Sequence, residues 1–138
     1  MALFKYLLAL SLLLFATNAL AHDPDEPEFD SWYHGLTRPD LDHSSCCGKA
    51  DAYWCDIIHV RHDKVFCTIT DDRPDAPRGR PHIDIGTEME IPPEKMKWGP
   101  NDPDKTPPSN PTGHAIIFII NGGSYSPYVL CFVPGTGI

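Results

Sequence analysis

The stretch HAIIFII at residues 114–120 and the stretch YVLCFV at residues 128–133 carry the strongest fold signal in this sequence of 138 residues. Both are rich in β-branched and aromatic side chains, which favour strands. The connection between them begins Asn121-Gly122-Gly123-Ser124, whose residues tolerate the positive φ angles of hairpin turns. We therefore predict an antiparallel hairpin. Since neither stretch alternates with polar residues, both of its faces should be covered.

A second hairpin is predicted where residues 56–60 and 64–70 flank the polar connection Arg61-His62-Asp63. Residues 82–85 and 89–91 alternate between apolar and polar side chains, and they predict two further short strands. With the final hairpin, these segments place most of the regular structure in strands.

Fifteen prolines interrupt the chain too often for long helices. A short helical turn is predicted at residues 31–36, with Asp30 as its N-cap, and another at residues 46–53. The proline-rich stretches 71–81 and 100–111 are predicted surface loops. The sequence thus predicts a mainly β fold: a small antiparallel β-domain, a barrel or roll, with one or two short helical turns and disulfide bracing.

The first 21 residues have the three-part pattern of a secretory signal peptide. Lys5 precedes an apolar stretch at residues 6–15, and Ala19-Leu20-Ala21 places small residues where signal peptidase requires them. The apolar stretch is shorter than the ~20 residues that a membrane-spanning helix needs. We therefore expect cleavage after Ala21, and a mature protein that begins at His22 and has no transmembrane segment.

Cleavage would leave one domain, in which an acidic arm with a short helical turn (residues 22–45) precedes a β-rich domain (residues 46–138). Removal of Lys5 leaves ten basic against 19 acidic residues, a formal charge of −9. A chain with this charge repels phosphate backbones and anionic lipid headgroups. We therefore expect no nucleic acid as a partner and no binding to a membrane surface.

All the cysteines lie in the mature part of the chain, where an oxidising compartment, the periplasm or the exterior, permits disulfides. They are Cys46, Cys47, Cys55, Cys67 and Cys131. Five is an odd number, so at least one thiol is free, capped or bonded to another chain. Adjacent cysteines rarely bond to each other, because the small ring is strained, so Cys46 and Cys47 should reach different partners. A bridge from this pair to Cys131 would contribute ~4–5 kcal/mol in the chain-entropy model.

The spacing of the seven histidines matches no common metal motif. His22 is the exception, because cleavage would give it a free α-amine beside its own imidazole, a pair that chelates copper. One further histidine, such as His114, would complete a copper or zinc site, which is one hypothesis for a cofactor. Asp102 and Asp104 lack the later glycine and glutamate of a calcium-binding loop, so we expect solvated loop charges there.

A different hypothesis is a hydrolase in which Cys47, within Ser44-Ser45-Cys46-Cys47-Gly48, is the nucleophile and His114 its base. The competing interpretation is that both adjacent cysteines are oxidised in disulfides, and it fits an oxidising compartment better. Nor does the adjacent pair match the Cys-x-x-Cys motif of thiol oxidoreductases.

Aromatic residues near predicted loops and strand ends favour binding over catalysis. Such rings often line ligand or partner grooves, although they also close the ends of small cores. The candidates are Trp32, Tyr33, Tyr53, Trp54 and Trp98. The sequence contains no complete catalytic motif. Our leading prediction is an exported, non-enzymatic β-domain that binds a small ligand or a protein of the cell envelope.

Six motifs are spread over most of the mature chain. They are Ala21-His22-Asp23, Ser31-Trp32-Tyr33, SCCGKADAYW at 45–54, EIPPEKMKW at 90–98, NPTGH at 110–114 and CFVP at 131–134. In these motifs the chain resembles a group of small exported proteins of alphaproteobacteria. The resemblance implies a periplasmic or secreted bacterial setting, and it brings no activity, cofactor or binding residue with it.

Overall fold

The computed structural model describes residues 24–76, 78–105, 109–122, 124 and 127–136. The predicted signal peptide and His22 lie outside the described residues.

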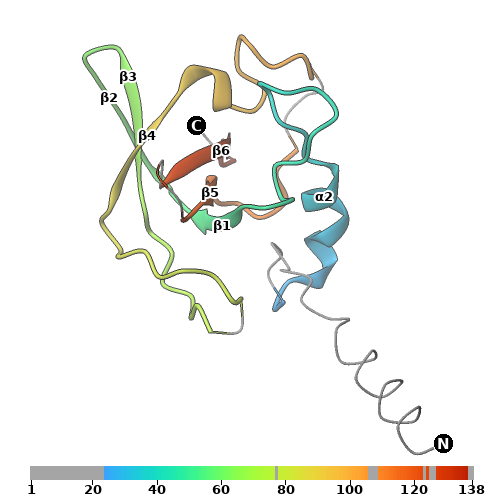
Figure 1. Ribbon diagram of the computed structural model, residues 1–138, viewed down its shortest axis with the longest axis vertical. Helices are drawn as coiled ribbons and strands as arrows, with labels where there is room; N and C mark the ends of the chain where they lie inside the picture. Colours follow the sequence, from blue (N-terminus) through green and yellow to red (C-terminus); the bar gives the residue numbers. More distant parts are fainter. Residues whose placement is uncertain (1–23, 77, 106–108, 123, 125–126, 137–138) are drawn as a thin grey trace, which may run out of the picture.

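In the described part of the chain, six strands form two antiparallel sheets of three strands each (Figure 1). The strand orders are β1-β5-β6 and β2-β3-β4. The bounds are β1 Asp51–Trp54, β2 Ile57–Arg61, β3 Lys64–Thr68, β4 Glu88–Ile91, β5 Ile116–Ile120 and β6 Tyr128–Val133. The prediction of a small, mainly β domain is confirmed, with two open sheets in place of a closed barrel.

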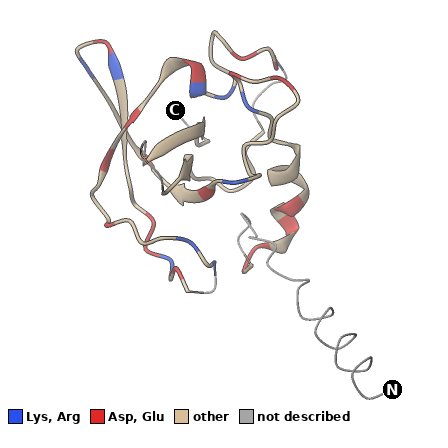
Figure 2. Ribbon diagram, in the orientation of Figure 1, with Lys and Arg blue, Asp and Glu red and all other residues tan. Residues whose placement is uncertain are grey.

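The core surrounds β5, the middle strand of its sheet. Ile117 and Ile119 belong to one hydrophobic cluster, which they share with the inner face of the β2-β3-β4 sheet. Ile116 and Phe118 belong to a second cluster, which includes Leu36 and other residues beside the short helix. Both faces of the final hairpin are therefore covered, as its unbroken apolar sequence predicts. Charged side chains lie on the loops, on the short helices and on the other strands, and β5 and β6 carry none (Figure 2).

The β2–β3 hairpin is confirmed, and its turn has two residues. His62 and Asp63 both have positive φ angles, 48° and 62°, and Arg61 pairs with Lys64 across the turn. Two successive positive φ angles match the right-handed twist of the flanking strands. Figure 1 shows this hairpin extending away from the rest of the domain.

The helix α2 spans Asp30–Gly35 and directly follows a short 3-10 turn, η2, at Pro27–Phe29. Phe29 is the N-cap residue, and no side chain caps the helix. The predicted capping role of Asp30 is therefore wrong: the preceding turn already winds the chain, so Asp30 lies inside the helix. No helix among the described residues has the length and hydropathy that crossing a bilayer requires.

Two other local predictions are wrong. Residues 51–53, predicted as the end of a helical turn, belong to β1 instead, because β1 pairs with β5 from Asp51↔Ile119 to Trp54↔Ile116. Residues 82–85 form no strand, since the chain turns there: the Thr87 N–H donates to the Asp84 carbonyl at 3.1 Å. Pairing with β3 begins only at Glu88.

Two disulfides connect these elements. Cys46–Cys131 joins the segment before β1 to β6, and Cys55–Cys67 joins the start of the second sheet to β3. Cys46 is thus the member of the adjacent pair that reaches Cys131. Disulfides of this kind are typical of proteins that fold in an oxidising compartment, and they suggest a location outside the cytoplasm.

Candidate ligand-binding pocket

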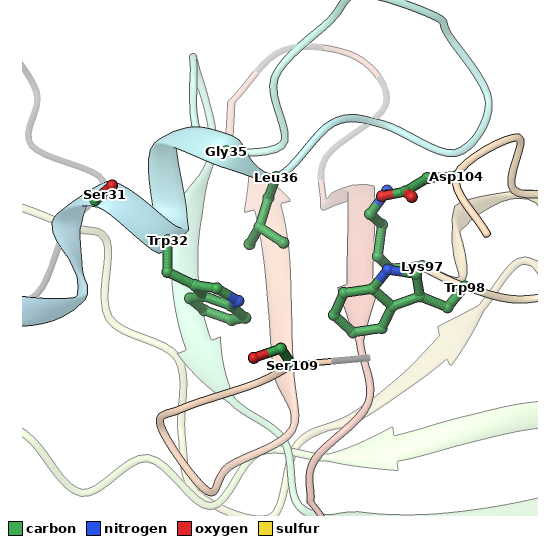
Figure 3. Close-up of a pocket in the computed structure, with 8 residues that line it drawn as sticks. All are labelled: Ser31, Trp32, Gly35, Leu36, Lys97, Trp98, Asp104 and Ser109. Atoms are coloured by element: carbon green, nitrogen blue, oxygen red, sulfur yellow. The ribbon is translucent and has the colours of Figure 1, made fainter. Parts of the chain in front are cut away.

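A pocket of about 230 Å³ opens between α2 and the loop that follows the 3-10 turn η3, Pro93–Lys95. Its walls come from two parts of the chain that are far apart in the sequence: α2 with the residue after it, and the loops that follow η3. The lining residues are Ser31, Trp32, Gly35, Leu36, Lys97, Trp98, Asp104 and Ser109. Figure 3 shows the indole rings of Trp32 and Trp98 on opposite sides of the space, with Leu36 at one end and Ser109 at the other.

The Trp32 wall is supported by the core. Trp32 lies on α2, and its ring meets the next ring along the chain, Tyr33, edge to face at 5.0 Å between centroids. Tyr33 is buried and makes a similar contact with Phe118 of β5 at 6.2 Å. These edge-to-face contacts fix the orientation of the rings. The first indole therefore stands on a rigid base.

The Trp98 wall is held in an uncommon backbone conformation. Trp98 has a φ of 58°, a region that bulky residues rarely adopt. The backbone N–H of Trp98 donates to Oδ2 of Asp102 at 2.6 Å, and this carboxylate is fully buried. The next residue is Gly99, where a Cβ would lie 3.0 Å from the Met96 carbonyl oxygen, a tighter contact than most side chains make, so glycine fits best there. The loop thus accepts local strain in order to place this indole.

Lys97 is buried, with a relative exposure of 1 %, and its ammonium lies among three oxygens. It donates to Oδ2 of Asp104 at 2.9 Å and to the Thr37 hydroxyl at 3.3 Å, and it lies 3.1 Å from Oδ2 of Asp102. Three acceptors match the three hydrogens of an ammonium. Thr37 follows α2 in the chain, so this lysine ties the two walls of the pocket together.

One polar atom in the wall has no partner. The indole Nε1 of Trp98 is buried, and among the described residues no acceptor lies within hydrogen-bond distance. Leaving a buried donor unpaired costs about 1–3 kcal/mol. The buried Nε1 of Trp54 is unpaired in the described part of the chain as well, so the feature that distinguishes Trp98 from Trp54 is its strained φ angle, which proteins tend to keep at functional sites.

The structure brings together two of the five predicted aromatic candidates, Trp32 and Trp98. Tyr33 and Tyr53 are buried in the core and do not line the pocket. Trp54 lies elsewhere, between His114 and Arg73.

The expectation that Asp102 and Asp104 are solvated loop charges is wrong for Asp102, which has a relative exposure of 1 %. Lys97 was not among the site residues that the sequence predicted. A lysine beside a tryptophan, followed by a glycine and closely spaced aspartates, was the available signal. It does not reveal that the charges fold inward around the lysine.

The hydrolase hypothesis finds no support in the geometry. Cys47 is buried, its thiol donates to the Tyr33 carbonyl at 3.0 Å, and burial raises its pKa to about 12 despite a hydrogen bond with Ser45. A thiol of this kind is inert, because only the thiolate is a nucleophile. His114 instead interacts with Asp56, at 2.9 Å between Nδ1 and Oδ2.

Neither does the described part of the chain contain a group of three or more His, Cys, Asp or Glu side chains placed to hold a metal ion. His22, the other proposed ligand, lies outside the described residues. The copper or zinc hypothesis therefore stays a prediction.

Comparison with family models, curated proteins and solved structures gives no match.

Proposed function

We propose that the protein is exported to the periplasm or the exterior and binds a small ligand there, without catalysis, in the pocket between Trp32 and Trp98. One observation carries the proposal: two indole rings from distant segments face one another across a defined cavity (Figure 3). Tryptophan offers a large apolar surface at a small entropic cost, and pockets lined by such rings with a few polar groups are typical ligand sites.

The size of the pocket limits the ligand. Pockets for drug-sized molecules measure roughly 300–1,000 Å³. At about 230 Å³, this pocket suits a molecule with a single ring, or one ring of a larger molecule whose remainder stays in solvent.

Binding without catalysis agrees with the chemistry of the walls. Neither histidine nor cysteine is among the residues that line the pocket, so the usual general base and the usual thiol nucleophile are missing from its described walls. The two charged groups, Lys97 and Asp104, are bonded to each other. Both have a structural role in holding the loop.

The test uses protein expressed with its own leader and purified from the exported fraction. Intact mass should show a chain that begins at His22, and recovery of only the uncleaved protein in the cytoplasm would contradict export. The chain has three tryptophans, which give three indole N–H signals in a ¹⁵N NMR spectrum. Glucose, N-acetylglucosamine, choline, phenol and sodium gluconate are then titrated separately.

We expect at least one of these probes to shift the signals of Trp32 and Trp98 and to leave that of Trp54 unchanged. Trp54 is the internal control, because both of its faces are covered by Arg73 and His114. If no probe moves the two pocket signals selectively, the proposed function is wrong.

A further inference from the structure

Resting on the proposed function, we infer that the pocket between Trp32 and Trp98 takes a neutral ring that carries hydroxyl groups, of the size of one sugar unit. The inference follows from three properties of the walls: how their charges are paired, which polar groups stand beside the indoles, and how large the cavity is.

An anionic ligand would find no free cationic donor here. Among the described lining residues the Lys97 ammonium is the one cation, and its surroundings already supply oxygens of Asp104, Asp102 and Thr37. An anion would have to displace one of these oxygens, and two of them belong to carboxylates that would then repel it. The excess of acidic residues in the whole chain acts in the same direction.

A cationic ligand is disfavoured for the opposite reason. Lys97 Nζ already lies 5.9 Å from the centroid of the Trp98 ring, so a ligand cation on this indole would be close to a like charge. Lys97 and Asp104, the charged residues of the lining, pair with each other, and the buried Asp102 brings the charge of the three groups to −1. The net negative charge of the domain attracts cations from a distance, but salt screens that attraction beyond about 8–10 Å.

A purely hydrocarbon ring is disfavoured by the polar groups. The Ser109 hydroxyl and the Asp104 carboxylate lie beside the same cavity as the indoles, and Ser31 belongs to its rim on α2 with its hydroxyl turned away from the rings (Figure 3). An apolar ligand would remove water from them without replacing its hydrogen bonds, at about 1–3 kcal/mol for each group left unpaired. A ring with hydroxyls on its edge and C–H groups on its faces meets both requirements. Its edge can form hydrogen bonds with Ser109 and Asp104 while its faces contact the indoles.

The titration described above decides the matter, with two further neutral probes. We expect glucose or N-acetylglucosamine to shift the Trp32 and Trp98 signals, with a Kd of roughly millimolar order for so small a contact. myo-Inositol should bind comparably, and cyclohexanol, which keeps one hydroxyl, should bind at least tenfold more weakly. Choline and gluconate, one cationic and one anionic, should shift neither signal.

Variants connect the signal to the walls. Trp32→Ala should weaken sugar binding at least tenfold, Ser109→Ala should weaken it several-fold, and Trp54→Phe should leave it unchanged. Because Trp98→Ala alters a strained loop, Trp98→Phe serves beside it: the retained ring should preserve part of the affinity. The dispersed spectrum and the Trp54 signal report that each variant is folded.

The outcomes separate the two proposals. If choline or phenol shifts the pocket signals and the sugars do not, the pocket binds ligands, but the inferred class, a neutral ring with several hydroxyls, is wrong. If sugars shift all three indoles equally and Ser109→Ala has no effect, the inference is also overturned. If no probe shifts the pocket signals, both proposals fail.

Discussion

Trp54 and Trp98 are held in the domain by similar contacts, but Trp98 lines the pocket described above and Trp54 does not. Each backbone N–H donates to a buried aspartate, at 3.1 Å to Asp71 and 2.6 Å to Asp102. Each aspartate also pairs with a buried basic residue: Asp71 with Arg80, and Asp102 with Lys97.

The difference lies in what covers the rings. His114 stacks on Trp54 at 3.7 Å between centroids, and the Arg73 guanidinium lies 3.9 Å from the centroid of the same ring. Trp98 instead faces Trp32 across the pocket (Figure 3). A buried ion pair can therefore hold a loop for two purposes: to seal the edge of a sheet, as Asp71 and Arg80 do for β1, or to support one wall of a cavity.

The largest expected effect is the loss of the ion pairs that Asp71 makes with Arg73 and Arg80. Asp71→Ala should lower the free energy of unfolding by about 3–5 kcal/mol, because Arg73 and Arg80 both lose a carboxylate and Arg80 is buried. Urea denaturation measures the change. The neighbouring Asp72→Ala is the matched control, since Asp72 is exposed, and it should cost less than ~0.5 kcal/mol. Equal effects of the two substitutions would show that the ion pairs of Asp71 contribute little to the free energy of unfolding.

A smaller loss of stability, with a larger loss of binding, is expected on the pocket side. Asp102→Ala should cost about 2–3 kcal/mol, because Lys97 keeps Asp104 as a partner while the Trp98 N–H loses its acceptor. The Trp98 indole signal should move, and its response to glucose should disappear. Asp102→Asn keeps an acceptor oxygen and should preserve part of that response. If the alanine variant binds normally, Asp102 does not position Trp98.

Acid should destabilise the protein by protonating the aspartates of its ion pairs. Burial alone would raise the pKa of Asp71, but hydrogen bonds from Arg73, Arg80 and the Trp54 N–H lower it well below the ordinary value of 3.8. A lowered pKa contributes stability that is fully present above the unfolded pKa and is lost as the pH falls through the folded one.

The wild type should therefore lose stability progressively below about pH 4. Asp71→Ala should show a flatter dependence over this range in urea denaturation at pH 5, 4 and 3. Asp40 contributes to the same loss of stability in acid. Burial alone would raise its pKa, but hydrogen bonds with Arg38 and Lys95 lower it to about 2. After allowance for solvent screening, we expect about 1 kcal/mol from Asp40. A curve for Asp71→Ala parallel to that of the wild type would contradict this origin.

The smallest expected effect makes Trp54 resemble Trp98. His114→Ala uncovers one face of the Trp54 ring and removes the partner of Asp56, at an expected cost of about 1 kcal/mol. In a background with Trp32→Phe and Trp98→Phe, acrylamide should quench the remaining Trp54 fluorescence more strongly after the substitution. Unchanged quenching would mean that His114 does not protect this ring.

The hairpins could be predicted from the sequence because their signal is local. The unbroken apolar runs of β5 and β6 and the turn after Arg61 need no information from the rest of the chain. β1 could not be predicted in the same way. It has four residues, Asp51–Trp54, and its structure depends on pairing with β5.

The pocket was accessible from the sequence only in part. Trp32 and Trp98 were candidates because they are aromatic and lie near predicted loops. Nothing in the sequence brings these two together and separates them from Trp54, since that depends on which segments meet in three dimensions. Asp71 and Asp102 were missed for the same reason: a buried aspartate cannot be told from a solvated one before its basic partner has been located.

The burial of Cys47 has a consequence for how the covalent framework is kept. Two neighbouring thiols, Cys46 and Cys47, are available to Cys131 while the chain folds, so an isomeric crosslink can form first. Exchange between the isomers requires a thiolate. Once the native bond has formed, the remaining thiol is enclosed beside Tyr33 with its pKa raised to about 12 by burial. Formation of the native Cys46–Cys131 bond therefore leaves no thiolate at Cys47 to attack it, and further exchange between the two isomers stops.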